Sequence, residues 1–429
     1  MLISRALFVA TVAFVASHAP FSDASSTARN PLKTVGVVRD ASILTKNHKV
    51  NILSTFDLAF DAGGSRIRLS LEPNHDIIAE NAVITYARAD GRVLREEPLN
   101  REEHRVYKGS AWVKRGQRWD QVGWSRITVR RDGLAPLFEG AFTIDHNHHH
   151  IQLSTNYKKS RQELDPDIDL REDEYMVVFR DSDISADEEH MELKKRGPEE
   201  MGCRSDELGF NMQPEHPVFA SMSRREVEEE SSFWSTPISS MFGKRQIDNS
   251  PGGGNGAGVN LVQSIGSTAG CPTTRKVALV GVAADCTYIQ SFNSTESARA
   301  NIINQINAAS NLYESTFNIS LGLANLFVVE RECPTSVQST TPWNRDCQSN
   351  IDIQERLNLF SQWRGQQRDS NSHWTLLSTC NSGSAVGLAW LGQACTQGSQ
   401  PNNSTAGSSE MVAGANVVIR TLTEWQVIA

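Results

Sequence analysis

The chain has 429 residues, of which 39% are hydrophobic and 21% are charged. This composition can build a buried core, so it excludes global disorder, a collagen-like rod and a coiled-coil rod. The formal net charge of -8 argues against a general nucleic-acid binder.

The first residues have the pattern of a secretory signal. Arg5 supplies a positive charge, and an apolar run from Ala6 to Ala16 follows it. The run is too short to span a bilayer, and no later stretch approaches the ~18 apolar residues that a membrane helix needs. We therefore predict a signal peptide over residues 1–19, a secreted protein and no membrane span.

Residues 48–145 alternate polar and apolar side chains, as in Ser65–Leu71 and Leu137–Ile144. Turn pairs such as Asp90-Gly91 interrupt these runs, so we predict an antiparallel β region, assigned to residues 20–160. Three adjacent histidines, His148 to His150, follow it. Three neighbours on one turn cannot all ligate one ion with good geometry, so we interpret them as a polar turn, with weak adventitious zinc binding as the alternative.

Residues 161–245 are acidic, and only Tyr175–Phe179 reads as a strand. They contain one cysteine, Cys203, which is either an unpaired surface thiol or a thiolate that ligates a catalytic zinc while this segment is attached. The dibasic pair Lys244-Arg245 precedes a Gly-rich linker over residues 246–269. Because charge and cysteine usage both change there, we predict cleavage after Arg245 by a secretory processing protease.

From residue 270 the pattern becomes α/β. It predicts strands over residues 277–284, 321–329, 374–377, 386–391 and 416–420, and helices over residues 296–316 and 351–363. Thr421 and Glu424 have capping-box spacing, so a further helix should open at Trp425. His373 is the one histidine beyond residue 246, and we interpret it as a surface or packing residue.

The same part of the chain carries the features of a secreted protein. An even set of cysteines indicates disulfides, with 15 pairings that the sequence leaves open. The candidates are Cys271, Cys286, Cys333, Cys347, Cys380 and Cys395. Candidate N-glycosylation sites are Asn293, Asn318, Asn402 and Asn403. The sequence contains no H-E-x-x-H, C-x-x-C, G-x-S-x-G or P-loop motif.

Three stretches carry a resemblance to a known family. Cys271–Cys286 resembles the start of the catalytic domain in fungal ADAM-type (disintegrin and metalloproteinase, reprolysin-like) zinc proteases. Ala385–Gly392, followed by Cys395, is similar to that family's edge strand, which binds substrate by strand addition. Gly414–Ala429 resembles the segment that leads into its active-site helix.

The resemblance implies a multi-domain α+β protein: a β-rich pro-domain, then an incomplete α/β metzincin-like (reprolysin) catalytic subdomain over residues 270–429. It assigns the substrate edge strand to Gly387, Leu388, Ala389 and Trp390. It also implies a secreted zinc endopeptidase precursor that acts on protein or peptide substrates in extended conformation, with zinc as the cofactor and a zinc-activated water as the nucleophile.

The family's next residues would be H-E-x-x-H-x-x-G-x-x-H, and this sequence ends at Ala429 before them. We therefore interpret the chain as a truncated precursor without catalytic or zinc-binding residues of the family. We expect it to be inactive as given and to bind no zinc tightly. The alternative hypothesis is a non-catalytic secreted module that docks peptides or carries the inhibitory segment.

Overall fold

The computed structural model describes residues 31–161, 164–169, 171–185, 205, 208–213, 216, 272–381, 385–403 and 409–428. The expected signal peptide, Cys203, the Lys244-Arg245 pair, the Gly-rich linker and Cys271 lie outside these described residues.

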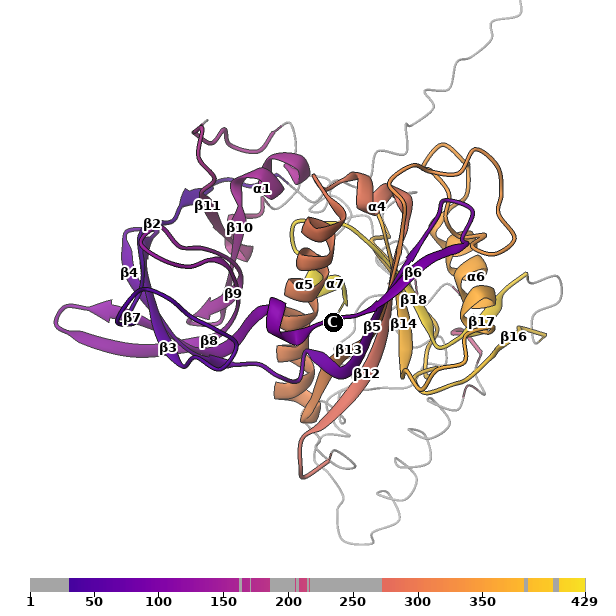
Figure 1. Ribbon diagram of the computed structural model, residues 1–429, viewed down its shortest axis with the longest axis horizontal. Coiled ribbons are helices and arrows are strands. Elements are labelled where there is room, and N and C mark those ends of the chain that lie inside the picture. Colours follow the sequence, from indigo (N-terminus) through magenta and orange to yellow (C-terminus); the bar gives the residue numbers. More distant parts are fainter. Residues whose placement is uncertain are drawn as a thin grey trace, which may run out of the picture.

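The N-terminal strands form an antiparallel sheet, as the alternating pattern predicts. Its order is β1-β11-β10-β9-β8-β7-β4-β3-β2. Figure 1 shows it curling at one end of the molecule, and its buried apolar side chains form a cluster of their own. The strands are β1 (Gly36–Val37), β2 (Arg39–Ile43), β3 (Phe56–Ala62), β4 (Ser65–Pro73), β7 (Arg105–Arg115), β8 (Arg118–Arg131), β9 (Leu137–Ile144), β10 (Asn147–Leu153) and β11 (Met176–Arg180).

Aromatic side chains fill the inside of this sheet. Phe60 on β3 contacts Phe138 and Phe142 on β9, with ring centroids 5.4 Å and 5.9 Å away. All three rings are fully buried. The alternation of the sequence therefore places one face of each strand in a common core.

The three histidines lie in a strand, so their interpretation as a polar turn is wrong. The turn is made one step earlier, by Asp145 and His146, whose φ angles are 49° and 68°. Two consecutive residues with positive φ form the tight turn that matches the twist of paired strands. The chain therefore reverses before His148, and the histidines alternate between the two faces of β10.

The second sheet is mixed and has the order β15-β18-β14-β12-β13-β5-β6. The strands from β18 to β5 run parallel, whereas β15 and β6 are antiparallel to their neighbours at the two ends. The bounds are β5 (Ile78–Ala87), β6 (Val93–Pro98), β12 (Lys276–Ala284), β13 (Ile319–Val329), β14 (His373–Ser378), β15 (Gly387–Ala389) and β18 (Ala415–Ile419).

Two long helices cover this sheet, and the sequence predicts both. Helix α5 (Thr295–Phe317) begins after Ser294, whose hydroxyl accepts from the Ser297 N–H, and ends at Asn318 with φ 56°. Helix α6 (Ile353–Arg364) begins after Asp352, which caps the Glu355 N–H. In Figure 1, α5 lies between the two sheets and α6 lies on the far side of the second one.

One part of the second sheet was not expected. The hairpin β5–β6 belongs by sequence to the β region over residues 20–160, yet it pairs with β13. Figure 1 shows this hairpin in purple beside the orange strands. The two halves of the chain therefore share one sheet.

The remaining elements are short. They are the strands β16 (Ser399–Pro401) and β17 (Met411–Ala413), the helices α1 (Ser154–Ser160), α4 (Cys286–Gln290) and α7 (Glu424–Ile428), and the 3-10 turns η1 (Arg101–Glu103) and η2 (Asp181–Asp183). Across the described ranges, none of the helices has the length and apolar character needed to cross a membrane.

Candidate functional site

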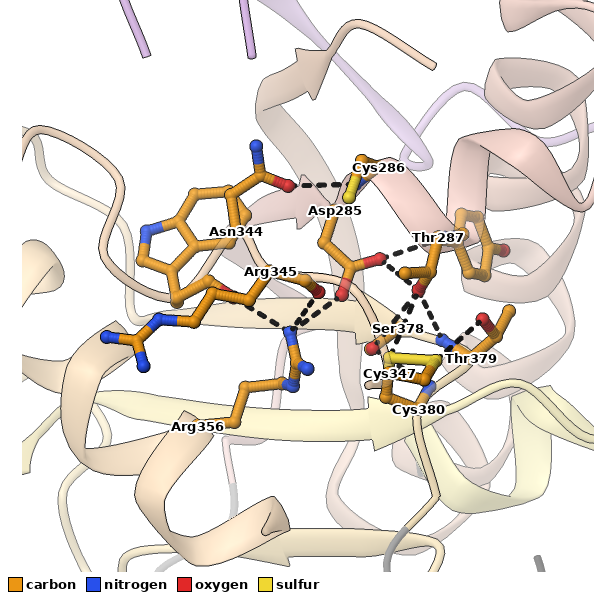
Figure 2. A network of polar contacts seen from close by, with 12 residues as sticks. Asp285, Cys286, Thr287, Asn344, Arg345, Cys347, Arg356, Ser378, Thr379 and Cys380 are labelled. Atoms are coloured by element: carbon orange, nitrogen blue, oxygen red, sulfur yellow. Dashed lines mark hydrogen bonds and ion pairs between the residues drawn. A yellow bond between two sulfur atoms is a disulfide. The ribbon is translucent and has the colours of Figure 1, made fainter. Parts of the chain in front are cut away.

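The carboxyl ends of β12 and β14 are fixed by a buried polar network, which Figure 2 shows from close by. Asp285 directly follows β12, and its Oδ1 accepts from the Tyr288 N–H at 2.8 Å, so it caps α4. Its Oδ2 pairs with Arg356 Nη1 at 3.1 Å, and both side chains are at most 1% exposed. Burial lowers the pKa of Arg356, and Asp285 opposes this shift. The pair ties α6 to the end of the central strand.

Two disulfides flank this network. Cys286 pairs with Cys333, and Cys347 pairs with Cys380. The sequence left the pairing open, and both pairings tie the single loop between β13 and α6 to the chain just after β12 and just after β14. Cys395 is exposed and forms no disulfide within the described part of the chain.

The expected edge strand lies at the end of the second sheet. Residues Gly387–Ala389 form β15, which pairs with β18 on one side and is the terminal strand on the other. Trp390 lies just beyond the strand. Its buried indole Nε1–H donates to Ser361 Oγ on α6 at 2.8 Å, which turns the chain into the core.

A short segment from the acidic region lies against the free side of this edge. The side-chain amide of Asn211 makes two hydrogen bonds with backbone groups there. Its Nδ2 donates to the Ala389 carbonyl at 2.9 Å, and its Oδ1 accepts from the Leu391 N–H at 2.8 Å. A primary amide that donates and accepts in this way uses the same groups that an added strand would use.

Glu410 holds the same segment by its backbone. Its buried carboxylate accepts from the backbone N–H groups of Gly209 at 2.7 Å and Phe210 at 2.8 Å. Leu208 is 1% exposed and belongs to the same apolar cluster as Leu388 and Trp390. We name residues 208–213 the edge-covering segment. Sequence reasoning missed it, because neither Asn211 nor Glu410 stands in a recognisable motif.

We expect Asn211→Ala to loosen the edge-covering segment. The change removes the two amide hydrogen bonds to the edge and a third to the Ser205 carbonyl at 2.7 Å. It leaves the Leu391 N–H without its acceptor, which costs about 1–3 kcal/mol. Hydrogen exchange at the Leu391 amide should therefore become about tenfold faster or more. Asn403→Ala, an exposed asparagine nearby, is the matched control and should leave that exchange rate unchanged. Equal exchange rates in both variants would show that the Asn211 hydrogen bonds do not stabilise the edge-covering segment.

The histidines of β10 serve a structural contact. His150 Nε2 lies 2.6 Å from Asp181 Oδ1, and its Nδ1 accepts from the Trp425 indole N–H at 3.1 Å. An ionised carboxylate only accepts and an indole only donates, so His150 is the neutral tautomer protonated at Nε2. His148 Nδ1 donates to Asp181 Oδ2 at 2.8 Å. Both nitrogens of His150 are thus committed to α7 and η2.

These residues do not fit a zinc site. His149 points to the other face and stacks on Phe142 at 4.8 Å, so the three histidines do not converge. In the described ranges, no group of three His, Cys, Asp or Glu side chains could hold a metal ion. His373 begins β14, where burial lowers the pKa of its imidazole to about 4, in agreement with a packing role.

Helix α7 also buries an acid. Glu424 accepts from the Tyr288 hydroxyl at 2.7 Å and from Asn301 Nδ2 at 3.4 Å. Its side chain is fully buried, and this burial raises the pKa of Glu424 to about 7. Glu424 therefore anchors α7 to α4 and α5, while the Trp425 bond to His150 joins the same helix to β10 of the first sheet.

The candidate glycosylation sites differ in accessibility. Asn293 and Asn403 are exposed, and Asn318 is half-buried at the end of α5. Asn402 is 6% exposed, and its Nδ2 donates to Glu410 Oε2 at 2.7 Å. A glycan would attach to that nitrogen, which is engaged in this fold, whereas Asn403 is the exposed member of the overlapping pair.

Comparison with known proteins shows which family this chain is similar to. Residues 273–429 match the model of metallo-peptidase family M12, described as Reprolysin_5. The chain is 45% identical over 427 residues to "Disintegrin and metalloproteinase domain-containing protein B" of Aspergillus fumigatus, which covers 97% of this chain and 53% of that protein. The protein of the same name from Arthroderma benhamiae is 40% identical over 430 residues, or 98% of this chain and 53% of that protein.

Residues 273–429 are thus a metallo-peptidase domain of the M12 type. The chain belongs to the fungal ADAM-type metalloprotease family, as its sequence resemblance indicated. It spans about half the length of the curated relatives it matches.

Proposed function

We propose that this chain is part of the precursor of a secreted zinc metalloendopeptidase, in which β15 receives protein or peptide substrates in extended conformation. The observation that carries the proposal is the position of β15: a short antiparallel strand at one end of the mixed seven-stranded sheet, within the matched M12 domain. Such an edge offers backbone donors and acceptors to an added strand.

The proposal includes the precursor's processing. The edge-covering segment belongs to the acidic region that precedes Lys244-Arg245, and its Asn211 amide uses two backbone groups of the edge. We propose that a processing protease cuts after Arg245, and that Cys203, eight residues before Asn211, is a candidate for the inhibitory switch. The disulfides support passage through an oxidising secretory compartment.

Zinc belongs to the complete family members under this proposal. The 429 residues contain no H-E-x-x-H, and the described residues offer no set of ligands that fits the ion. We therefore assign no step of peptide hydrolysis to this polypeptide.

We expect the purified 429-residue chain to show no zinc-dependent proteolysis and no stoichiometric tight zinc. A catalytic zinc needs three protein ligands and an open position, and the sequence after Arg245 offers one histidine. Metal analysis after dialysis against a chelator, beside a fluorogenic peptide assay, measures both. One retained zinc per chain with chelator-sensitive cleavage would contradict the expectation.

The second candidate function is a non-catalytic module that docks peptides or carries an inhibitory segment. The occupied edge favours it, because the chain already contains both a docking site and an occupant. Binding of a labelled, unstructured peptide distinguishes the edge covered by residues 208–213 from the uncovered edge. Asn211→Ala should raise this binding relative to wild type and to Asn403→Ala, and unchanged binding would remove the support for a docking role.

A further inference from the structure

The hairpin β5–β6 is joined to the metallo-peptidase sheet by a backbone ladder. Strand β5 pairs in parallel with β13 from Asn325↔Val83 to Val329↔Ala87. The ladder is extended at both ends, since the Leu323 N–H donates to the Ile77 carbonyl at 2.8 Å and the Glu330 N–H donates to the Ala87 carbonyl at 2.9 Å. Without this hairpin, β13 would become an open sheet edge.

The side chains of the hairpin complete the apolar core of the C-terminal half. Ile78 and Ile84 are at most 2% exposed and lie in one cluster with Leu323 and Leu326 of β13 and Ile302 of α5. Since one cluster draws on both halves, separating them would expose apolar surface on both sides.

Buried polar contacts fix the two halves at further points. Arg126 of β8 and Glu314 of α5 form an ion pair of 2.9 Å, with both side chains at most 6% exposed. Asn74 Nδ2 donates to Asn307 Oδ1 at 2.8 Å inside the same interface. Beside the middle of α5, where the Trp425 backbone N–H donates to Gln305, the Trp425 indole donates to His150 on β10. None of these contacts involves the chain between residues 217 and 271.

We propose that residues 31–185 remain bound to residues 272–428 after the backbone between them is cut, so that cleavage after Arg245 yields a two-fragment particle and not a free metallo-peptidase domain. A cut in the linker removes the tether that raises the effective concentration of one half near the other, and it breaks none of the contacts named above. The shared ladder, core and ion pair stay intact. Release of the N-terminal fragment then requires the hydrogen bonds between β5 and β13 to break, which is a partial unfolding of the sheet.

The cleavage site after Arg245 rests on the proposed function, whereas the continued binding of residues 31–185 to residues 272–428 does not. The test therefore places the recognition sequence of a site-specific protease in the Gly-rich stretch 252–258 of the full chain. After the cut, both fragments should co-elute in size exclusion, and amide exchange in residues 325–329 should stay within about twofold of the uncut chain. Separate elution of the fragments in native buffer, or loss of protection in β13, would overturn the proposal.

Two matched variants test the shared sheet itself. Ile84→Ala opens a cavity in the joint core and should speed release of the N-terminal fragment from the cut protein at least about tenfold. Ile67 on β4 is equally buried but belongs to the separate core of the first sheet. Ile67→Ala should leave the release rate within about twofold of wild type. Equal acceleration by both variants would show that β5 is not what retains the fragment, and the exchange measurement in β13 decides the proposal even if a variant fails to fold.

Discussion

Replacing Arg356 by methionine should lower the free energy of unfolding by about 3–5 kcal/mol, because it leaves the Asp285 carboxylate buried without its cation. Within the described residues, the side chain of Arg356 makes its hydrogen bonds through one nitrogen. Its Nη1 donates to Asp285 Oδ2, to the Trp343 carbonyl at 2.8 Å and to the Arg345 carbonyl at 3.2 Å. Figure 2 shows these contacts converging between α6 and the end of β12. Urea unfolding of the oxidised protein measures the change.

The charge, and not the lost packing, should dominate this effect. Arg356→Met combined with Asp285→Asn should recover part of the stability, because asparagine removes the charge and keeps an oxygen that can cap α4. The surface pair of Lys49 and Asp132 is the control. Its lysine is 67% exposed, so Lys49→Met should cost at most about 1 kcal/mol. A similarly small cost for Arg356→Met would show that the Asp285 carboxylate is not held as a buried charge.

Removing the carboxyl group of Glu424 should change how stability depends on pH. Burial raises the pKa of Glu424 from 4.5 to about 7, so the folded state binds a proton that the unfolded state releases. The stabilisation is fully present below pH 4.5 and is lost as the pH rises through about 7. The difference between the two pKa values corresponds to about 3 kcal/mol.

The test compares wild type with Glu424→Gln, because other groups titrate in the same range with the opposite sign. Burial lowers the pKa of His150, for example, so its contribution is lost as the pH falls. From about pH 4.5 to about pH 8, Glu424→Gln should gain about 3 kcal/mol of unfolding free energy relative to wild type. Glu355→Gln, an exposed acid in the first turn of α6, should track wild type. A pH-independent difference for Glu424→Gln would mean that Glu424 is ionised in the fold at neutral pH.

A retained N-terminal half would alter how such a precursor matures. If β5 stays paired with β13 after the linker is cut, the edge at β15 can still be covered by residues 208–213, which lie before the cut. Uncovering the edge would then need either a second cut or dissociation of the shared sheet. The Asn211 hydrogen bonds lie at the β15 end of the seven-stranded sheet, and the pairing of β5 with β13 lies toward the other end. The two sets of contacts can therefore be tested separately.

Local sequence patterns predicted the C-terminal elements well. The apolar run at 277–284 became the central strand β12, and the helical spacing at 296–316 became α5, because strands and helices covered by packing partners show their periodicity directly. The resemblance to ADAM-type proteases also placed Gly387–Ala389 at a sheet edge. These features depend on residues that are close together in the chain.

The sequence by itself therefore determined the metallo-peptidase elements, the alternating strands of the N-terminal sheet and the family. Only the tertiary structure decided that β5 leaves the N-terminal strands and extends the metallo-peptidase sheet, and that the Asn211 amide covers the β15 edge of this sheet. It also decided that the histidines of β10 bond to Asp181 and Trp425. The physical reason is that strand pairing and side-chain hydrogen bonds join groups up to hundreds of residues apart, and no local period records which partner a strand or an amide will find.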